Sequence, residues 1–147
     1  MNRMTETNTS NLQMFESAPQ IDFEKYEGKR AKIEIVQVVD AVSDYGLDGI
    51  RVVGLKRPVK KLHVATEVLE TIQKDEPIQI RAHAYFNLKE KVVNGTTVWG
   101  VSKSTKSKLY NFMKKQKANT VDELKGTLVT LTTKTDDNDR VWLNFAQ

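Results

Sequence analysis

The sequence predicts a mainly β protein: a curved antiparallel barrel with one main α-helix before a C-terminal β-hairpin. Apolar and polar residues alternate along several stretches, which is the period of a half-buried strand. One such stretch changes phase at Ile35-Val36, and a phase change of this kind indicates a β-bulge that bends the strand. Over Thr105–Lys117, by contrast, the apolar residues recur at the spacing of an amphipathic helix.

The length of 147 residues fits one domain, which we assign to residues 21–147. Residues 1–20 are polar and lack periodicity, so we expect a disordered tail in which Met14-Phe15 is a weak docking motif or simply lies free. The absence of cysteine excludes disulfide scaffolds, zinc fingers, iron–sulfur sites and thiol catalysis. No apolar run approaches the roughly 20 residues that cross a bilayer, and no secretory signal is present. We therefore expect a cytoplasmic protein that does not contact membranes.

Short strands are expected in the N-terminal part of this domain. The first begins at Arg30 and continues through the phase change to Val38, and Ser43-Asp44-Tyr45-Gly46 then gives a turn signal. Gly49–Leu55 is the next expected strand, and Val59–Val64 follows it after Pro58.

Residues 59–74 allow two interpretations. Apolar residues from Val64 to Ile72 have helical spacing and Thr66 is a suitable N-cap, which predicts a short helix over Thr66–Lys74. A pair of strands over 59–74 is the alternative.

Pro77–Leu88 alternates strictly and predicts a long strand with one buried face. Asn94-Gly95 follows between β-formers and predicts a two-residue hairpin turn, because both of its positions favour a positive φ. That turn sets a register in which Val93 faces Thr96 and Lys91 faces Val98.

The main helix is expected over Thr105–Lys117, with Leu109, Phe112 and Met113 on its apolar stripe and cap residues in Ser102-Lys103-Ser104.

A capping box at Thr120-Val121-Asp122-Glu123 opens a single turn that stops at Gly126. Strands over Thr127–Thr133 and Arg140–Phe145 then form the last hairpin around the acidic turn Asp136–Asp139, with Val141, Leu143 and Phe145 on one face.

Ser102–Phe145 contains a Ser/Lys-rich helix start, the run TVDELKG, a Thr-rich strand and the run WLNF. This combination resembles OB-fold single-stranded DNA-binding proteins of microbes and their viruses and plasmids. The resemblance implies an OB-like barrel. It also implies DNA rather than RNA as the ligand.

The formal net charge is only +4, but the cations are unevenly distributed along the chain. Arg51–Lys61 holds five cations and Ser102–Ala118 holds six, and neither segment contains an acid. The two segments thus carry eleven of the 23 cations, and the rest of the chain is net acidic. A solvated lysine face explains one such segment well, whereas two in one small domain favour a polyanionic ligand.

The position of each aromatic residue along its strand predicts which face of the sheet its side chain occupies. Trp142 shares a face with Arg140, and Tyr85 shares one with Arg81, in both cases opposite the apolar face. Exposed aromatics next to cations are what a non-specific single-strand binder needs, although a covering helix or tail would make them structural. The register of the Asn94-Gly95 hairpin puts Trp99 on the other face, which we interpret as core.

Motifs for catalysis are missing. His63 and His83 are 20 residues apart without metal-ligand spacing, and there is neither a Gly-rich phosphate loop nor a nucleophile elbow. Asp136–Asp139 is interpreted as a solvated turn, because it lacks the glycine and glutamate of a calcium loop. We therefore expect no enzyme activity, no cofactor and no metal.

The resulting hypothesis is non-sequence-specific binding of single-stranded nucleic acid, with a second copy of the chain and replication or repair proteins as further candidate partners. The alternative is a protein-interaction module, an adaptor or inhibitor, that uses the same barrel face. The candidate nucleic-acid-binding residues are Arg51, Lys56, Arg57, Lys60, Lys61, Arg81, Tyr85, Lys103, Lys106, Lys108, Arg140 and Trp142.

Overall fold

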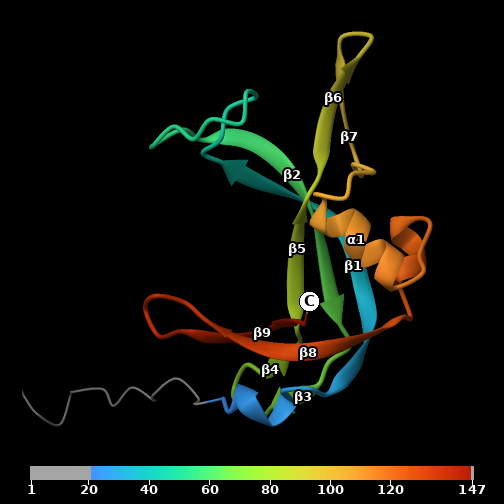
Figure 1. Ribbon diagram of the computed structural model, residues 1–147. Helices are drawn as coiled ribbons and strands as arrows, with labels where there is room; N and C mark the ends of the chain where they lie inside the picture. Colours follow the sequence, from blue (N-terminus) through green and yellow to red (C-terminus); the bar gives the residue numbers. More distant parts are fainter. Residues whose placement is uncertain (1–20, 147) are drawn as a thin grey trace, which may run out of the picture.

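The structure is a computed structural model that describes residues 21–146 (Figure 1). The predicted tail over residues 1–20, with Met14-Phe15, lies outside the described residues. The described elements are, in chain order, η3 (Phe23–Tyr26), β1 (Arg30–Ser43), β2 (Arg57–Thr66), β3 (Glu70–Ile72), β4 (Ile78–Ile80), β5 (His83–Asn87), β6 (Lys89–Val93), β7 (Thr96–Gly100), α1 (Lys108–Lys115), η4 (Val121–Leu124), β8 (Leu128–Thr135) and β9 (Val141–Phe145).

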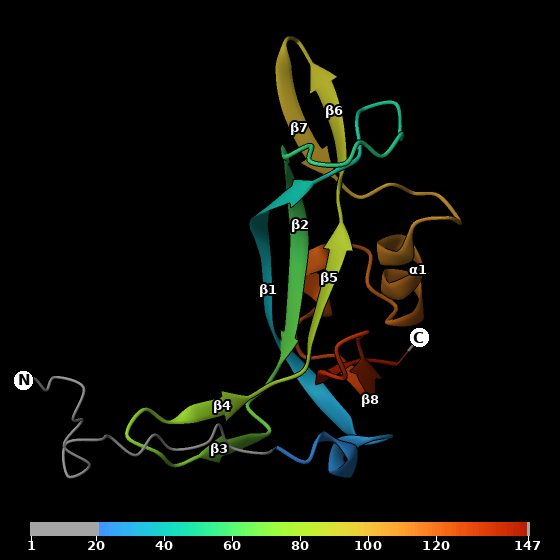
Figure 2. The same cartoon turned by 90° about the vertical axis from the view of Figure 1, so that its left-hand side faces the viewer.

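Five of these strands form one antiparallel sheet in the order β5-β2-β1-β8-β9. The sheet curves strongly, so that its edge strands β5 and β9 come into contact, but the two form no hydrogen-bonded ladder. Hairpins β3–β4 and β6–β7 extend from opposite ends of the sheet (Figures 1 and 2). The predicted mainly β architecture, with one main helix before a C-terminal hairpin, is confirmed, and the barrel is open.

The predicted bulge in the first strand is also confirmed, slightly earlier than the phase change suggested. Ile33 lies opposite Thr66 and Ile35 lies opposite Ala65, which leaves Glu34 as the extra residue on β1. An extra residue on one strand bends it and increases its twist. Because of this bend, β1 pairs with β8 through Arg30–Lys32 and with β2 through the rest of its length.

Helix α1 packs its apolar stripe onto the concave side of the sheet. Leu109, Phe112 and Met113 are all buried, as predicted. The Phe112 ring is stacked between Phe86 of β5, at 5.1 Å, and Phe145 of β9, at 5.8 Å between centroids. The helix thus links the two edge strands that hydrogen bonds do not join.

The helix is shorter than predicted because Ser107 is its N-cap, rather than a residue of Ser102-Lys103-Ser104. The Ser107 hydroxyl accepts a hydrogen bond from the backbone N–H of Tyr110, at 3.2 Å. At the other end Lys117 has a φ of 58°, which terminates the helical ladder.

The predicted strand over Gly49–Leu55 is wrong. Residues 44–56 form a loop whose one ladder contact is the bridge between Tyr45 and Arg51. Ile50 and Val52, the two apolar residues that are in phase along this segment, are exposed, because no neighbouring strand is available to cover them.

The predicted helix over Thr66–Lys74 is wrong as well, and the strand alternative is correct. Glu70 of β3 lies opposite Ile80 of β4, and the Glu70 carboxylate accepts a hydrogen bond from the Tyr26 hydroxyl and forms an ion pair with Lys25. The β-branched Thr71 and Ile72 favour this extended backbone over a helix.

The long strand predicted over Pro77–Leu88 is divided into β4 and β5 at Arg81-Ala82. Thr66 causes the division: its hydroxyl accepts from the Ala82 N–H at 3.0 Å, and its carbonyl accepts from Arg81 at 2.9 Å. The predicted buried face is confirmed at Ile80, Ala82, Ala84 and Phe86.

Both predicted hairpins are present. Val93 lies opposite Thr96 and Lys91 opposite Val98, with Asn94 at φ 52° and Gly95 at φ 78° in the turn.

In the C-terminal hairpin, Leu143 and Phe145 are buried as predicted. Val141 is instead 41% exposed, because it lies next to the open end of the β8–β9 turn.

The Phe112–Phe145 contact gives a first prediction. Phe145 is fully buried, so Phe145→Ala leaves a cavity between helix and sheet and should lower the free energy of unfolding by about 3–5 kcal/mol. Urea denaturation followed by circular dichroism measures this change. Val53→Ala is the control, because Val53 is 88% exposed and its truncation should be nearly neutral. Equal effects of the two changes would contradict this description of the core.

Candidate functional site

Two open pockets lie next to each other at the end of the sheet that carries the β6–β7 hairpin. The lysine pocket, of about 590 Å³, lies between β5 and the start of α1, and the loop pocket, of about 550 Å³, lies between loop 44–56 and the β6–β7 hairpin. Both are lined by Lys61, Asn87, Leu88 and Lys89.

The lysine pocket contains four cations and no carboxylate. Its walls come from four parts of the chain, listed here in sequence order: Lys61, Tyr85, Phe86, Asn87, Leu88, Lys89, Ser102, Ser104, Lys106, Ser107, Lys108 and Leu109. Lys61 belongs to the first acid-free segment, and Lys106 and Lys108 belong to the second. The fold therefore brings one cation of the first cluster next to two cations of the second.

Strand geometry explains why these side chains converge. Leu62 of β2 and Phe86 of β5 face the core, so their neighbours Lys61 and Tyr85 point to the outer face. Tyr85 is 60% exposed there, as its parity predicted.

The lysines at the start of α1 are electrostatically unfavourable in the free protein. Lys108 is the first residue of the helix, and its first turn contains no acid. A helix N-terminus carries partial positive charge, so Lys106 and Lys108 are repelled by it and by each other. An anion in the lysine pocket would relieve both repulsions.

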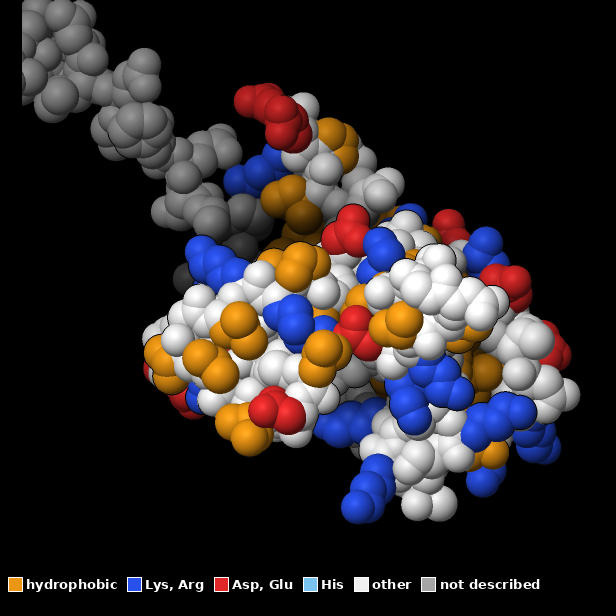
Figure 3. All heavy atoms as spheres, turned by 90° about the horizontal axis from the view of Figure 1, so that it is seen from above, with side chains coloured by type: hydrophobic (Ala, Val, Ile, Leu, Met, Phe, Trp, Pro, Cys, Tyr) orange, Lys and Arg blue, Asp and Glu red, His pale blue; other side chains and the backbone are white. Residues whose placement is uncertain are grey.

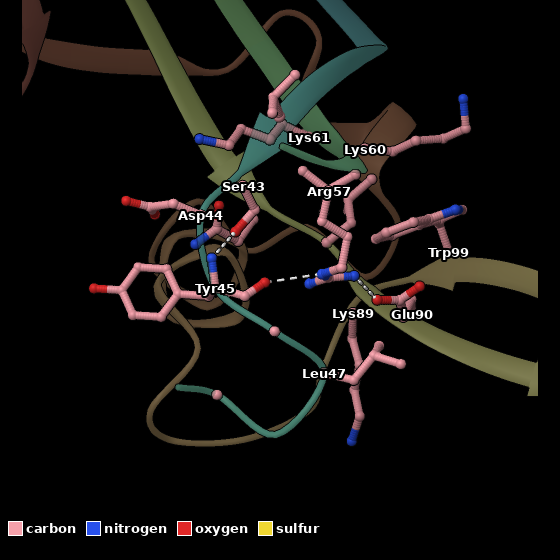
Figure 4. Close-up of a pocket in the computed structure, with 16 residues that line it drawn as sticks. Ser43, Asp44, Tyr45, Leu47, Arg57, Lys60, Lys61, Lys89, Glu90 and Trp99 are labelled. Atoms are coloured by element: carbon pink, nitrogen blue, oxygen red, sulfur yellow. Dashed lines mark hydrogen bonds and ion pairs between the residues drawn. The ribbon is translucent and has the colours of Figure 1, made fainter. Parts of the chain in front are cut away.

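The loop pocket differs because its central cation is neutralised. Figure 4 shows Arg57 between two acceptors: its Nε donates to the Tyr45 carbonyl at 2.9 Å, and its Nη1 is ion-paired with Glu90. Trp99 also lines this pocket and is only half-buried. The prediction that Trp99 belongs to the core is therefore wrong. Its face of the β6–β7 hairpin lies against loop 44–56 instead of the barrel interior.

Half of the predicted cations form ion pairs with carboxylates. These ion pairs are Arg51 with Asp44, Arg57 with Glu90, Lys60 with Asp40, Arg81 with Glu34 and Arg140 with Asp136. The other half make no ion pair within residues 21–146; they are Lys56, Lys61, Lys103, Lys106 and Lys108.

Not all of the predicted residues are brought together. Arg81 is mostly buried and ties β1 to the β4–β5 junction, and Arg140 braces the β8–β9 turn through Asp136. Trp142 is 39% exposed on β9, outside the linings of both pockets. Lys103 lines a third surface, the hairpin pocket, together with Lys89, Lys91, Val93, Val98, Gly100 and Val101.

Tyr85 is backed by a row of polar side chains that crosses three strands. Gln37 lies opposite His63, and His63 lies opposite Tyr85, whose ring stacks on the imidazole at 4.7 Å between centroids. Gln37 Nε2 lies 2.9 Å from His63 Nδ1, and His63 Nε2 lies 2.8 Å from His83 Nδ1. If the Gln37 amide donates, His63 Nε2–H donates to His83, and both imidazoles are neutral.

The surroundings of the two histidines favour this neutral form. Burial lowers the pKa of His63. Burial also lowers the pKa of His83, and the neighbouring His63 and Arg81 add to that effect. The row therefore forms a hydrogen-bonded support beneath Tyr85 in which the neutral imidazoles are favoured.

Sequence reasoning missed Lys89, which lines the lysine pocket, the loop pocket and the hairpin pocket. Its charge was hidden by the adjacent Glu90, which points to the opposite face and is neutralised by Arg57. The strand pattern contains a signal for Lys89, because odd-numbered residues share one face of the strand and Lys89 therefore lies on the same face as Tyr85 and Asn87.

Within residues 21–146 no helix is long and apolar enough to cross a membrane, and no group of three or more His, Cys, Asp or Glu residues could hold a metal ion. No family model, curated protein sequence or solved structure matches the chain.

The histidine row gives a second prediction. Both imidazoles have a lowered pKa in the folded protein, whereas in the unfolded chain each has the ordinary histidine pKa of about 6.5. As the pH falls through about 6.5, the unfolded chain therefore binds more protons than the folded protein. The free energy of unfolding should therefore be at its full value above that pH and decline below it. Urea denaturation between about pH 7.5 and 5.5 measures the slope, which the double variant His63→Gln/His83→Gln should flatten. An unchanged slope in the double variant would contradict the assignment.

Proposed function

We propose that this protein binds single-stranded nucleic acid, DNA in preference to RNA, and that the lysine pocket is the main contact. The observation that carries the proposal is the convergence of Lys61, Lys89, Lys106 and Lys108 around the exposed ring of Tyr85, with no carboxylate in the lining. Phosphates need cations that have no internal partner, and bases need a flat apolar surface that water can reach.

The arrangement of the main sheet supports the same proposal. Among its five strands, α1 lies between the third and fourth along the chain, and the lysine pocket is built on the second and third, β2 and β5. OB-folds bind oligonucleotides on the face of their second and third strands. The resemblance seen in Ser102–Phe145 thus agrees with the location of the cations.

The binding mode that follows is sequence-independent. The ammonium groups would neutralise successive phosphates as point charges, and the Tyr85 ring would stack with one base, held in orientation by His63. The start of α1 would contribute its N-terminal partial charge to the same backbone.

A protein-interaction module is the second candidate, on loop 44–56 rather than on the barrel face expected from the sequence, because this loop exposes apolar side chains. Leu47 is 80% exposed and Val53 is 88% exposed, next to the loop pocket. In this case the loop would be the binding surface, and changes in the lysine pocket would leave partner binding intact.

Salt dependence provides the third prediction. Neutralising four phosphates should give a slope of log K against log salt near −2.8, at about −0.7 per single-strand phosphate. The double variant Lys61→Gln/Lys106→Gln should reduce the slope to about −1.4, as measured by fluorescence anisotropy with a labelled oligonucleotide. Lys115→Gln/Lys125→Gln is the charge-matched control, because neither residue lines the lysine pocket. No binding at low salt, or an equal slope change in the control, would reject the proposal.

Stacking provides the fourth prediction. Tyr85→Ala should weaken oligonucleotide binding by roughly 1–3 kcal/mol, whereas Tyr85→Phe retains the ring and should bind nearly as well as the wild type. Trp142→Ala should weaken binding of an oligonucleotide of about 16 nucleotides but not one of about 4, because Trp142 lies beyond the pocket on β9. Equal affinity of Tyr85→Ala and wild type would exclude Tyr85 as a stacking platform.

A further inference from the structure

The β6–β7 hairpin is a two-stranded sheet of its own that projects beyond the main sheet (Figures 1 and 2). A lone hairpin is marginally stable in water unless it gains further strands or packs against another element. Val92 is 71% exposed and Val98 is 48% exposed. Figure 3 looks down on this end of the molecule and shows hydrophobic side chains spread over its surface among lysines and arginines. Part of the hairpin is therefore available to a partner.

The outer edge of β7 carries unpaired backbone groups at defined positions. The two-residue turn makes Val93 and Thr96 a hydrogen-bonded pair, and such pairs alternate along an antiparallel ladder. Lys91 and Val98 are the next hydrogen-bonded pair, so Thr97 and Trp99 direct their N–H and C=O groups away from β6. These four groups have no backbone partner elsewhere in residues 21–146.

The two edges of the hairpin differ in charge. Strand β6 reads KEKVV, whereas β7 reads TTVWG and contains no charge and no proline. Charged residues on an edge strand prevent further pairing, and an uncharged edge permits it. The β7 edge is therefore the open one.

We propose that β7 pairs antiparallel with β7 of a second copy of this chain, around a two-fold axis at Val98. In this register Val98 lies opposite Val98 of the second copy, and Thr97 lies opposite Trp99 in both directions. All four outward backbone groups of each strand are then hydrogen-bonded, and the hairpins form a four-stranded sheet in the order β6-β7-β7-β6. The proposal does not depend on nucleic-acid binding.

Charge is the reason that the occupant is a second copy paired through β7. Lys91 lies in the same row as Val98, so the two Lys91 residues are separated by three strand spacings, or about 14 Å. That separation exceeds the Debye length of about 8 Å at physiological salt, so their repulsion is screened. Pairing through β6 would instead put lysines on directly adjacent strands. In the proposed register each Trp99 also gains Thr97 as an aromatic–β-branched neighbour.

The protein has no cysteine, so one introduced thiol reports the register directly. Val98 forms a non-hydrogen-bonded pair across the axis, with Cα atoms about 4.5 Å apart, which is within the range that a disulfide bridges. Val98→Cys should therefore form a disulfide-linked dimer under mild oxidation at least ten times faster than Val92→Cys, an exposed control on β6.

The second variant removes one outward-pointing backbone N–H from the β7 edge and retains the hydrogen bonds within the hairpin. Thr97→Pro deletes an N–H that points away from β6, so the ladder within the monomer is retained, while Thr97→Val keeps the N–H. Edge pairing buries less than a standard interface of about 1,600 Å², so we expect micromolar association in sedimentation velocity across a concentration series. The wild type and Thr97→Val should self-associate, and Thr97→Pro should remain monomeric.

Combining the two changes completes the test. Thr97→Pro/Val98→Cys should lose the rapid cross-linking of Val98→Cys. A wild type that is monomeric throughout the concentration series would overturn the proposal. Equal cross-linking of Val98→Cys and Val92→Cys would also overturn it, as would a dimer that Thr97→Pro leaves intact.

Discussion

Strand β1 is paired with β8 through its first residues and with β2 through the remainder, and Glu34 has no opposite residue on β2. This extra residue bends one strand far enough to take part in both halves of a curved sheet. The curvature brings β5 and β9 close without a ladder between them, so Phe112 of α1 is needed to join the edges through Phe86 and Phe145. Because α1 is held there, its lysine-bearing start lies beside β5. The candidate site thus depends on the bulge.

The arginines and the lysines of the predicted set have different roles, and the difference follows from the chemistry of their side chains. Every arginine of the predicted set is paired with a carboxylate, which its planar, multidentate guanidinium favours. These pairs are structural: Arg57 fixes the base of the β6–β7 hairpin to loop 44–56, and Arg81 fixes the β4–β5 junction. The unpaired cations are lysines, and three of them converge with Lys89 on the lysine pocket. The number of cations in a segment of the sequence does not distinguish cations in structural ion pairs from cations that are free to bind a ligand.

Most of the fold could be predicted because it is encoded locally. Alternation gave the buried faces, Asn94-Gly95 gave the hairpin register, and the apolar stripe gave α1. The wrong predictions concern residues whose burial depends on packing partners that are distant in the sequence. Ile50 and Val52 alternate but have no strand to pair with, and Trp99 has the parity of a core residue on a hairpin that leaves the core. The site was predictable in residue type and only partly in position, because Lys61 and Lys106 meet through tertiary packing.

Strand β6 separates two kinds of surface at this end of the molecule. Glu90 points to the loop-pocket side, where Arg57 cancels its charge, and Lys91 lies on the opposite side, in the hairpin pocket with Lys103. Pairing of two molecules through β7 would leave that lysine side open, since strand pairing uses backbone groups in the plane of the sheet. Lys91 of both copies would then lie on one face of the four-stranded sheet, in a row with Val98. Self-association and binding of a polyanion would therefore not compete for the same atoms.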